Sequence, residues 1–333
     1  MSSTRYDVIG IGNAIVDVLS HSDEEFLQRQ KMPKGSMSLI DESRAEAIYN
    51  AMGPVIEVSG GSAANTIVGV AMLGGAAAFV GKVKNDELGH TFARDIRASG
   101  VAFTTPMAES GASTARCYIL VTPDGQRTMN TYLGAAQDLS PDDIAVDEIR
   151  AAKVLYLEGY LWDPKQAKNA FIKAAGIAHE NDRTVALTLS DAFCVDRYRK
   201  EFLELIRNKT VDLIFANEAE LKSLYETGDF DAALAALRQD VSIAVVTRSE
   251  QGAMVVTREA TESVPAFPVD RVVDTTGAGD LFAAGFLYGF ARNMPHVDSL
   301  RLGALCAAEV ISHMGARPER NLRDLANENG LLR

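Results

Sequence analysis

Cysteine is scarce in this sequence, and the three residues present lie far apart, without the close pairs of disulfide frameworks or zinc sites. The five histidines have neither metal-site nor catalytic-triad spacing. No apolar run approaches the roughly 20 residues that a bilayer-spanning helix needs, and the first residues lack the apolar core of a signal peptide. We therefore expect reduced, buried thiols and a cytoplasmic protein.

Basic residues are outnumbered, with 33 Lys and Arg against 45 Asp and Glu, which gives a formal net charge of -12. Such a field repels phosphate backbones and anionic lipids, so we expect no nucleic-acid or membrane partner. A nucleotide substrate remains compatible with a locally positive pocket. The 47% apolar and 23% charged composition is that of a globular protein.

Two familiar nucleotide-binding motifs are also missing. Gly10-Ile-Gly12 is followed by Ile15 where a dinucleotide fold needs its third glycine. The stretch from Gly75 to Lys82 has the wrong spacing for a P-loop, and Val83 stands where Ser or Thr is required. These departures disfavour an NAD-dependent oxidoreductase and a P-loop NTPase.

Short β-branched runs alternate with helical patterns along most of the chain. Near-continuous apolar strands separated by helices are typical of a mostly parallel sheet covered on both faces, whose ligands bind at the carboxyl ends of the strands. Towards the C-terminus, residues 277–291 and 297–314 are expected to be helices. The runs that we predict as buried strands are residues 6–12, 55–59, 77–81, 154–157, 184–189, 211–216 and 243–247.

Two segments, residues 34–40 and 112–132, replace this rhythm with alternating side chains, and the second contains the turn Thr122-Pro-Asp-Gly125. They indicate a hairpin in place of a helix. We predict a single domain over residues 1–333 that carries a small β lid formed by segments near 13–20, 34–40 and 112–134.

The most informative stretch is Asp274-Thr-Thr-Gly-Ala-Gly-Asp280, which leads directly into a predicted helix. Glycines at a helix start let backbone N–H groups approach an anion, and the helix dipole adds positive charge. Asp280 is then placed to accept the proton of an attacking hydroxyl, with residues 277–279 as the anion hole of a phosphoryl transfer. The alternative is an ordinary glycine turn with an acid at the helix start.

A second glycine-rich turn, Ser59-Gly-Gly-Ser-Ala-Ala-Asn65, lies between a predicted strand and a helix. Its paired glycines permit close backbone approach, and Asn65 offers a donor and an acceptor to a polyol. Asp17, just after the first strand, has two oxygens for two vicinal hydroxyls. Taken singly, the turn is as readily structural, and Asp17 as readily a surface residue.

Asn217-Glu-Ala-Glu220 follows the strand predicted at 211–216, so its polar side chains should lie at the carboxyl edge of the sheet. Such groups can hold the water shell of Mg²⁺ near ATP phosphates. Helix capping is the better interpretation of this run when it is taken alone.

The ordered motifs 60–65, 217–220 and 274–280 together resemble the PfkB/ribokinase family of carbohydrate and nucleoside kinases, from Val8 to about Leu325. The resemblance implies a ribokinase-like, doubly wound α/β fold with a lid, and MgATP as phosphoryl donor. It implies Asp280 as the base, Gly277, Ala278 and Gly279 as the anion hole, and Asn217 with Glu220 as the Mg²⁺-linked pair. ATP would also lie near Thr247 and Gly252, although Thr247-Arg-Ser-Glu-Gln-Gly252 departs from the expected Thr-x-Gly-x-x-Gly.

Within the family, Gly12-Asn-Ala-Ile-Val-Asp17 and Thr188-Leu-Ser-Asp-Ala-Phe193 are most similar to the adenosine-kinase branch. That resemblance implies that Arg127 approaches the phosphates. It implies a nucleoside contact for Asn13, Ile15, Asp17, Gly60, Gly61, Asn65, Leu133 and Phe193. The resemblance to the wider family implies that Asp274, Thr276 and Gly315 hold a monovalent cation such as K⁺.

We therefore expect transfer of the γ-phosphoryl of MgATP to the 5′-hydroxyl of a nucleoside, adenosine above all, by a monomer or homodimer. A sugar kinase of the same fold, acting on ribose or a ketohexose, is the nearest rival, and a non-catalytic nucleoside sensor is a second. An intact Asp280 with its glycines disfavours the sensor. A flat base is favoured over a bare sugar by five apolar residues, namely Ile15, Leu133, Leu161, Trp162 and Phe193.

Overall fold

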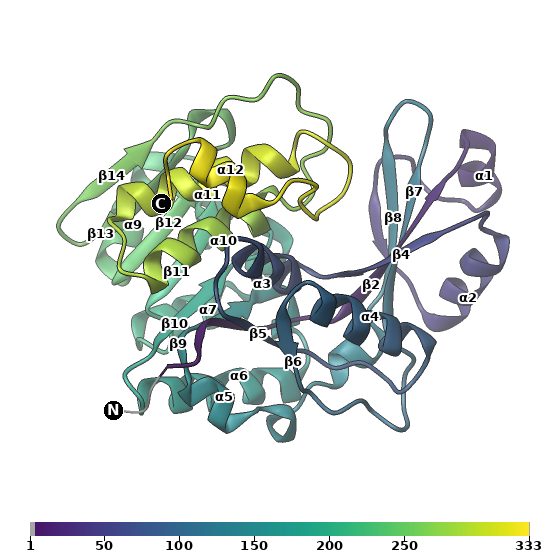
Figure 1. Ribbon diagram of the computed structural model, residues 1–333, viewed down its shortest axis with the longest axis horizontal. Helices are drawn as coiled ribbons and strands as arrows, with labels where there is room; N and C mark the ends of the chain where they lie inside the picture. The colour runs from purple at the N-terminus through teal and green to yellow at the C-terminus, as the bar shows by residue number, and fades with distance from the viewer. Residues whose placement is uncertain (1–3, 333) are drawn as a thin grey trace.

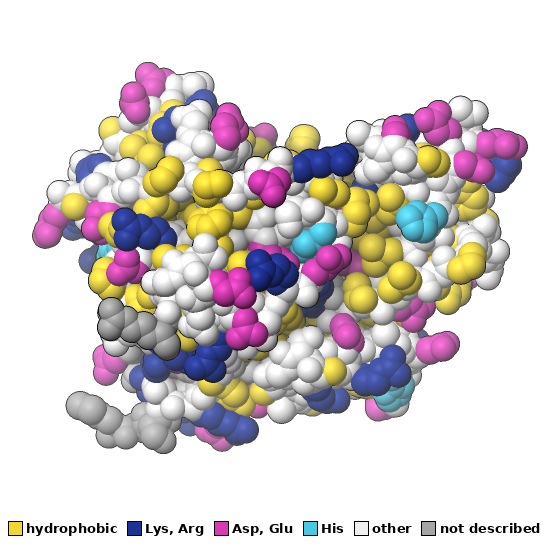
Figure 2. Space-filling model, turned by 45° about the horizontal axis from the view of Figure 1, so that its top comes forward, with side chains coloured by type: hydrophobic (Ala, Val, Ile, Leu, Met, Phe, Trp, Pro, Cys, Tyr) yellow, Lys and Arg dark blue, Asp and Glu magenta, His cyan; other side chains and the backbone are white. Residues whose placement is uncertain are grey.

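The protein is described by a computed structural model over residues 4–332. It has two unequal parts, a nine-stranded sheet layered between helices and a five-stranded sheet that stands beside it (Figure 1). None of the helices within residues 4–332 is both long and apolar enough to cross a membrane. Figure 2 shows acidic and basic side chains interspersed on the face that it draws.

The main sheet has the order β14-β13-β12-β11-β10-β9-β1-β5-β6. Every neighbouring pair from β12 to β6 is parallel, and β13 and β14 add an antiparallel edge, so the predicted doubly wound, mostly parallel sheet is confirmed. Its strands are β1 (Tyr6–Ile11), β5 (Ala77–Val80), β6 (Val101–Phe103), β9 (Ala152–Glu158), β10 (Thr184–Thr188), β11 (Leu213–Asn217), β12 (Ile243–Thr247), β13 (Ala253–Thr257) and β14 (Thr261–Val264).

Two cores lie on opposite faces of this sheet, because successive side chains of a strand point to opposite sides. In β1, Val8 belongs to one core and Ile9 to the other. The first core includes residues of α3 (Ser62–Met72), α4 (Glu87–Ala98), α10 (Ala278–Ala291), α11 (His296–Val310) and α12 (Leu322–Glu328). The second includes residues of α5 (Val146–Arg150), α6 (Lys165–His179), α7 (Ala192–Arg207), α8 (Glu218–Leu224) and α9 (Phe230–Asp240).

The five-stranded sheet has the order β3-β8-β7-β2-β4, with β3 (Met37–Leu39), β8 (Arg127–Tyr132), β7 (Ala115–Val121), β2 (Ile15–His21) and β4 (Ile56–Gly60). The hairpin expected around Thr122–Gly125 joins β7 to β8. In β2, Val16 and Val18 are fully buried, whereas Asp17 between them is only half-buried. The buried face joins the first core together with residues of α1 (Glu24–Arg29) and α2 (Glu42–Ala51).

One strand belongs to a different sheet from the one predicted. The apolar run at 55–59 does form a strand, β4, but it pairs antiparallel with β2 in the small sheet. Its burial pattern explains the difference, since Ile56 is 68% exposed and only Ser59 and Gly60 are buried, as suits an edge strand. A short apolar run predicts a strand without saying which sheet it joins.

Candidate active site

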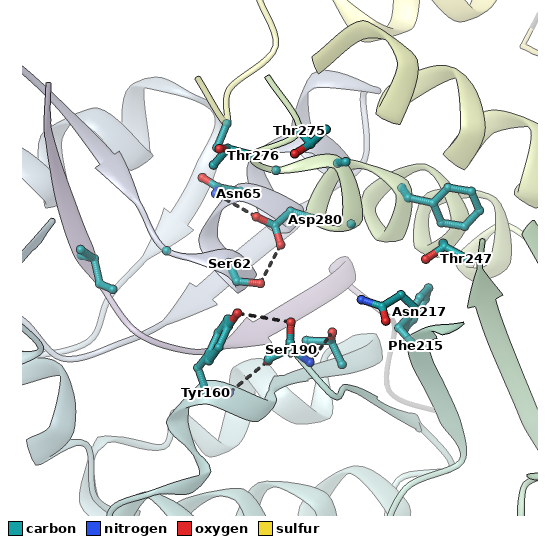
Figure 3. A pocket seen from close by; sticks show the side chains of 18 of the residues that line it. Ser62, Asn65, Tyr160, Ser190, Phe215, Asn217, Thr247, Thr275, Thr276 and Asp280 are labelled. Carbon is teal, nitrogen blue, oxygen red and sulfur yellow. Dashed lines mark hydrogen bonds between the residues drawn. The ribbon is translucent and has the colours of Figure 1, made fainter. Parts of the chain in front are cut away.

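A cavity of about 420 Å³ lies at the carboxyl ends of β9–β12 and is closed on one side by the small sheet (Figure 3). The small sheet contributes Ile15, Asp17, Cys117, Ile119, Met129 and Thr131. The main part contributes polar strand-end residues, glycine-turn residues and the 275–280 loop, including Gly61, Ser62, Asn65, Tyr160, Thr188, Ser190, Asn217, Glu220, Thr247, Gly277, Ala278, Gly279 and Asp280. The cavity therefore joins the two glycine-rich motifs that the sequence singles out.

Asp280 occupies the first turn of α10 and bonds to the first turn of α3 (Figure 3). Its Oδ1 accepts a hydrogen bond from Ser62 Oγ at 2.6 Å, and its Oδ2 accepts one from Asn65 Nδ2 at 3.0 Å. Burial raises the pKa of the carboxyl above its ordinary value, although these two hydrogen bonds and the charge of Arg317 oppose the rise. Asp280 is thus held in place and is a stronger proton acceptor than an ordinary aspartate.

The predicted anion hole lies at the N-terminus of α10, where Gly277 has a φ of 80°. A Cβ on Gly277 would lie 2.9 Å from Ala316 Cα, so both backbone conformation and space require glycine. Ala278 donates its N–H to Thr275 O at 3.2 Å, whereas nothing among residues 4–332 accepts the N–H of Gly279. The N–H of Gly279 is therefore open to an anion.

Asp17 and the first glycine turn meet at the other side of the cavity. The carboxylate of Asp17 lies over Gly60, where a Cβ would come within 2.4 Å of Oδ2. No described residue donates a hydrogen bond to Asp17, and Asn65 Oδ1 also has no partner among residues 4–332. Burial and the charge of Asp280 raise the pKa of Asp17 to about 6, against the lowering influence of Arg317 and Arg127. These unsatisfied acceptors suit a ligand with hydroxyl groups.

The small sheet presents a largely apolar wall to the cavity. Cys117 lies directly opposite Asp17 on one side and Thr131 on the other, and Ile119 lies opposite Met129. Burial raises the pKa of Cys117 to about 12, so the thiol is neutral, and Thr131 Oγ1 donates to its sulfur at 3.2 Å. This wall offers a flat, uncharged surface to a ligand.

Arg127 of β8 links the small sheet to the 274–280 loop. Its Nη1 lies 2.7 Å from Asp274 Oδ2, with 7% and 9% of the two side chains exposed. Nε and Nη2 of Arg127 are buried and have no partner within the described residues, which suits an additional anion. Asp274 Oδ2 also accepts from Gly315 N, and Oδ1 accepts from Thr276 N and Oγ1. With two bonds on each oxygen, the carboxylate has no free site for a K⁺ ion, which would have to rely on backbone carbonyls.

Asn217 and Glu220 form the capping box that we weighed against a magnesium role. Asn217 Oδ1 accepts from Glu220 N at 2.9 Å, and the Glu220 carboxylate accepts from both Asn217 N and Nδ2. Both residues nevertheless line the cavity, as does Thr247 at the end of β12. Burial raises the pKa of Glu220 to about 7, so a nearby cation would favour its charged form.

Several residues predicted at the nucleoside lie elsewhere. Phe193 is 83% exposed in the first turn of α7 and Leu133 precedes a 3₁₀ turn, and neither lines the cavity. Leu161 and Trp162 are buried in the second core, where the indole packs near Phe171, so their prediction as part of a base-binding wall is wrong. An apolar residue after a strand has the same sequence pattern in a core as in a pocket.

Two other predicted residues lie outside the cavity. Asn13 is buried and donates Nδ2 to Glu158 at 2.6 Å, while Glu158 also accepts from Ala63 N. Burial raises the pKa of Glu158 to about 7. Gly252 lies just before β13 and has a φ of 88°, and a Cβ at this position would lie 2.1 Å from Val264 O.

Sequence reasoning gave no role to several residues of the cavity, among them the small-sheet wall and Ser62, Tyr160 and Ser190. Ser62 lies inside a motif that we quoted without giving it a role, and it bonds to Asp280. Tyr160 donates its N–H to Ser190 Oγ at 3.0 Å and its hydroxyl to Ser190 O at 3.3 Å, in loops after β9 and β10 (Figure 3). Because ligands bind where parallel strands end, the position of Tyr160 and Ser190 just after β9 and β10 could have indicated that they line the site.

Similarity to known proteins shows the family of this chain. Residues 39–321 match the description "pfkB family carbohydrate kinase". The chain belongs to the pfkB family. An adenosine kinase from Sinorhizobium meliloti shares 51% identity and a TM-score of 0.91, covering 98% of this chain and 100% of that one. A probable sugar kinase from Rhizobium etli CFN 42 shares 50% identity and a TM-score of 0.92, covering 99% and 100%.

A curated relative, the probable fructokinase-4 of Arabidopsis thaliana, is 30% identical over 79% of this chain and 84% of its own. As a pfkB kinase, the protein is a phosphotransferase that acts on the alcohol group of a small molecule with ATP as co-substrate. The ribokinase-like fold predicted from the motifs is confirmed by the same matches.

Proposed function

We propose that this pfkB kinase phosphorylates the 5′-hydroxyl of adenosine and releases AMP and ADP. The observation that carries the proposal is the composition of one cavity. A held carboxylate and an open N–H lie at one end, Asp280 and Gly279, and the uncharged wall of Ile15, Ile119 and Met129 lies across from them. The similarity to the S. meliloti adenosine kinase over nearly the whole chain supports the same substrate.

The ribose is assigned to the unsatisfied acceptors. The two oxygens of Asp17 would take two vicinal hydroxyls, and Asn65 Oδ1 would take a third donor while Nδ2 stays on Asp280. A buried, charge-assisted grip of this kind fixes the sugar relative to the base. The 5′-hydroxyl would then lie next to Asp280.

In the transfer step, the oxygen of the substrate hydroxyl forms a bond to the γ-phosphorus while Asp280 accepts the proton of that hydroxyl. The bond between that phosphorus and the bridging oxygen breaks, and ADP leaves. The Gly279 N–H and the dipole of α10 stabilise the charge that develops on the phosphoryl oxygens. The unpartnered Nε and Nη2 of Arg127 would reach the same charge from the small sheet.

Mg²⁺ bound with ATP supplies neutralisation of the phosphate charge. Glu220 and Asn217 both line the cavity and are bonded to each other. They would therefore hold the Mg²⁺ ion through its water ligands and not directly. A monovalent cation near Asp274 stays a prediction, with backbone oxygens as its ligands. The small sheet is assigned the role of a lid that excludes water before transfer.

A sugar kinase remains the second candidate, and one observation favours it. Of the five apolar residues predicted beside a flat base, only Ile15 lines the cavity. Asp17 and Asn65 would serve a ketohexose as well as a ribose. The organisation as a single domain, the oligomeric state and the cytoplasmic location also stay predictions.

The test is to incubate the protein with MgATP and, separately, adenosine, inosine, guanosine, cytidine, ribose and fructose. ADP release and phosphorylated product are both measured, so that ATP hydrolysis is distinguished from transfer. We expect AMP from adenosine. Turnover of fructose or ribose alone would replace the nucleoside assignment by the sugar kinase and leave the Asp280 chemistry intact.

A further inference from the structure

Arg317 lies in the loop after α11 and bonds to the first glycine turn. Its Nε and Nη2 donate to Ser59 O at 3.1 and 2.7 Å, Nη2 also donates to Ser59 Oγ at 3.0 Å, and Nη1 donates to Ala64 O at 3.3 Å. The guanidinium therefore spans the turn from the last residues of β4 to the first turn of α3. Ser62 and Asn65, which hold Asp280, lie on this same stretch.

The two residues before Arg317 contact the other catalytic loop. Gly315 donates its N–H to Asp274 Oδ2 at 3.0 Å, and Ala316 packs against Gly277 so closely that a Cβ there would be 2.9 Å from Ala316 Cα. The segment 315–317 thus touches the anion-hole loop at one end and the substrate turn at the other. A change at its arginine can alter how these two loops meet.

Charge gives Arg317 a second link to the site. Burial lowers its pKa to about 10, so it remains a cation at neutral pH, and the carboxylates of Asp17, Asp95 and Asp280 act on it. Among residues 4–332, the hydrogen bonds of the Arg317 guanidinium go to Ser59 and Ala64, so Arg317 forms no direct ion pair with these three carboxylates. The other titratable groups that act on Asp280 or respond to it are Asp17 on β2, Tyr156 and Glu158 on β9, and Tyr160.

We propose that Arg317 is a positioning residue: its guanidinium holds the Ser59–Asn65 turn against Asp280 through its bonds to Ser59 and Ala64. The inference rests on the proposed function only in taking Asp280 as the base. Arg317 would thus act on catalysis without contacting either the substrate or ATP.

Two substitutions test this role. Arg317→Lys keeps the positive charge but cannot bond to both carbonyls, so kcat should fall by about tenfold at every pH. Arg317→Gln cannot span the turn either, so its kcat should fall by a similar factor at every pH. The melting temperature of each variant is measured alongside, so that lost positioning is distinguished from lost stability.

The profiles are measured with whichever acceptor the wild type phosphorylates, so a wrong substrate assignment does not obscure the result. Arg320→Gln is the matched control, because Arg320 lies in the same loop, is 55% exposed and pairs with Glu328 at the surface. It should keep the wild-type profile. A Gln variant with the wild-type kcat and an unchanged melting temperature would overturn the positioning role.

Should the Gln variant fail to fold, Arg317→Lys carries the test. Wild-type kcat in that variant would show that the fork does not position the turn and would overturn the proposal. Full activity of an Asp280→Asn variant would instead refute the base itself, which is a different failure.

Discussion

The two halves of the cavity are built differently. On the main part, Asp280 is bonded to Ser62 and Asn65, and Gly277 is packed on Ala316, so the groups assigned to chemistry are fixed by contacts within one core. On the small sheet, Asp17 lines the cavity and accepts no hydrogen bond from any residue between 4 and 332. Arg127 joins that sheet to the catalytic loop through its ion pair with Asp274. The difference teaches that bond-making groups are held rigidly here, while groups that select the ligand are left to be satisfied by it.

The largest effect is expected from a change at Asp280, on the main part of the protein. Asp280→Asn should lower kcat by about 10²- to 10⁴-fold, because the general base is lost, while nucleoside binding stays near that of the wild type. Steady-state kinetics and calorimetric titration with the acceptor measure the two effects. Near-normal turnover would exclude Asp280 as the base.

On the small sheet, Asp17→Ala should weaken acceptor binding and misplace the hydroxyl, at about 1.5 to 3 kcal/mol for a charge-assisted bond, or roughly 10- to 150-fold in kcat/KM. Unlike the change at Asp280, much of the loss should appear in KM. Unchanged KM and kcat would show that the acceptor hydroxyls bind elsewhere.

The same carboxylate predicts a pH effect of intermediate size. With its pKa at about 6, Asp17 is mostly ionised at pH 7 and mostly protonated at pH 5, where it loses acceptor capacity. KM for the acceptor should therefore rise by about tenfold as pH falls from 7 to 5. Asp17→Asn is the control, and the same rise in KM for that variant would assign the effect to another group.

The smallest change expected is at Cys117. Its neutral, buried thiol forms part of the wall and has no chemical task, so Cys117→Ala should alter kcat/KM by less than about threefold. A thermal melt run in parallel reports the packing cost. Loss of activity without loss of stability would contradict the assignment of this wall as passive.

Sequence patterns predicted the rigid half better than the other half. Asp280 and Gly277 belong to a continuous motif, whose function is set by local backbone geometry, and the alternating strands and helices specify the sheet that carries it. The small sheet is assembled from short segments paired across the chain. The placement of β4 therefore depends on contacts that no local pattern encodes.

Residues outside motifs were the hardest to predict. Trp162 and Phe193 both follow strand ends and both look like candidates for a base-binding wall, yet one is buried in the core and the other is exposed. Arg317 is a single arginine in a loop, and its importance comes from two carbonyls more than 250 positions away. Contacts between residues so far apart produce no local sequence pattern from which they could be predicted.

The bond between Ser62 and Asp280 spans 218 positions of the chain. A polypeptide grows from its N-terminus, so a ribosome-bound chain that has not yet emerged beyond residue 280 carries the glycine turn and the small sheet without a base or an anion hole. Until the 315–317 segment also emerges, the Ser59–Asn65 turn lacks the guanidinium that spans it. If Asp280 is the base as proposed, the catalytic centre is completed late in synthesis, and an unfinished chain could not transfer a phosphoryl group.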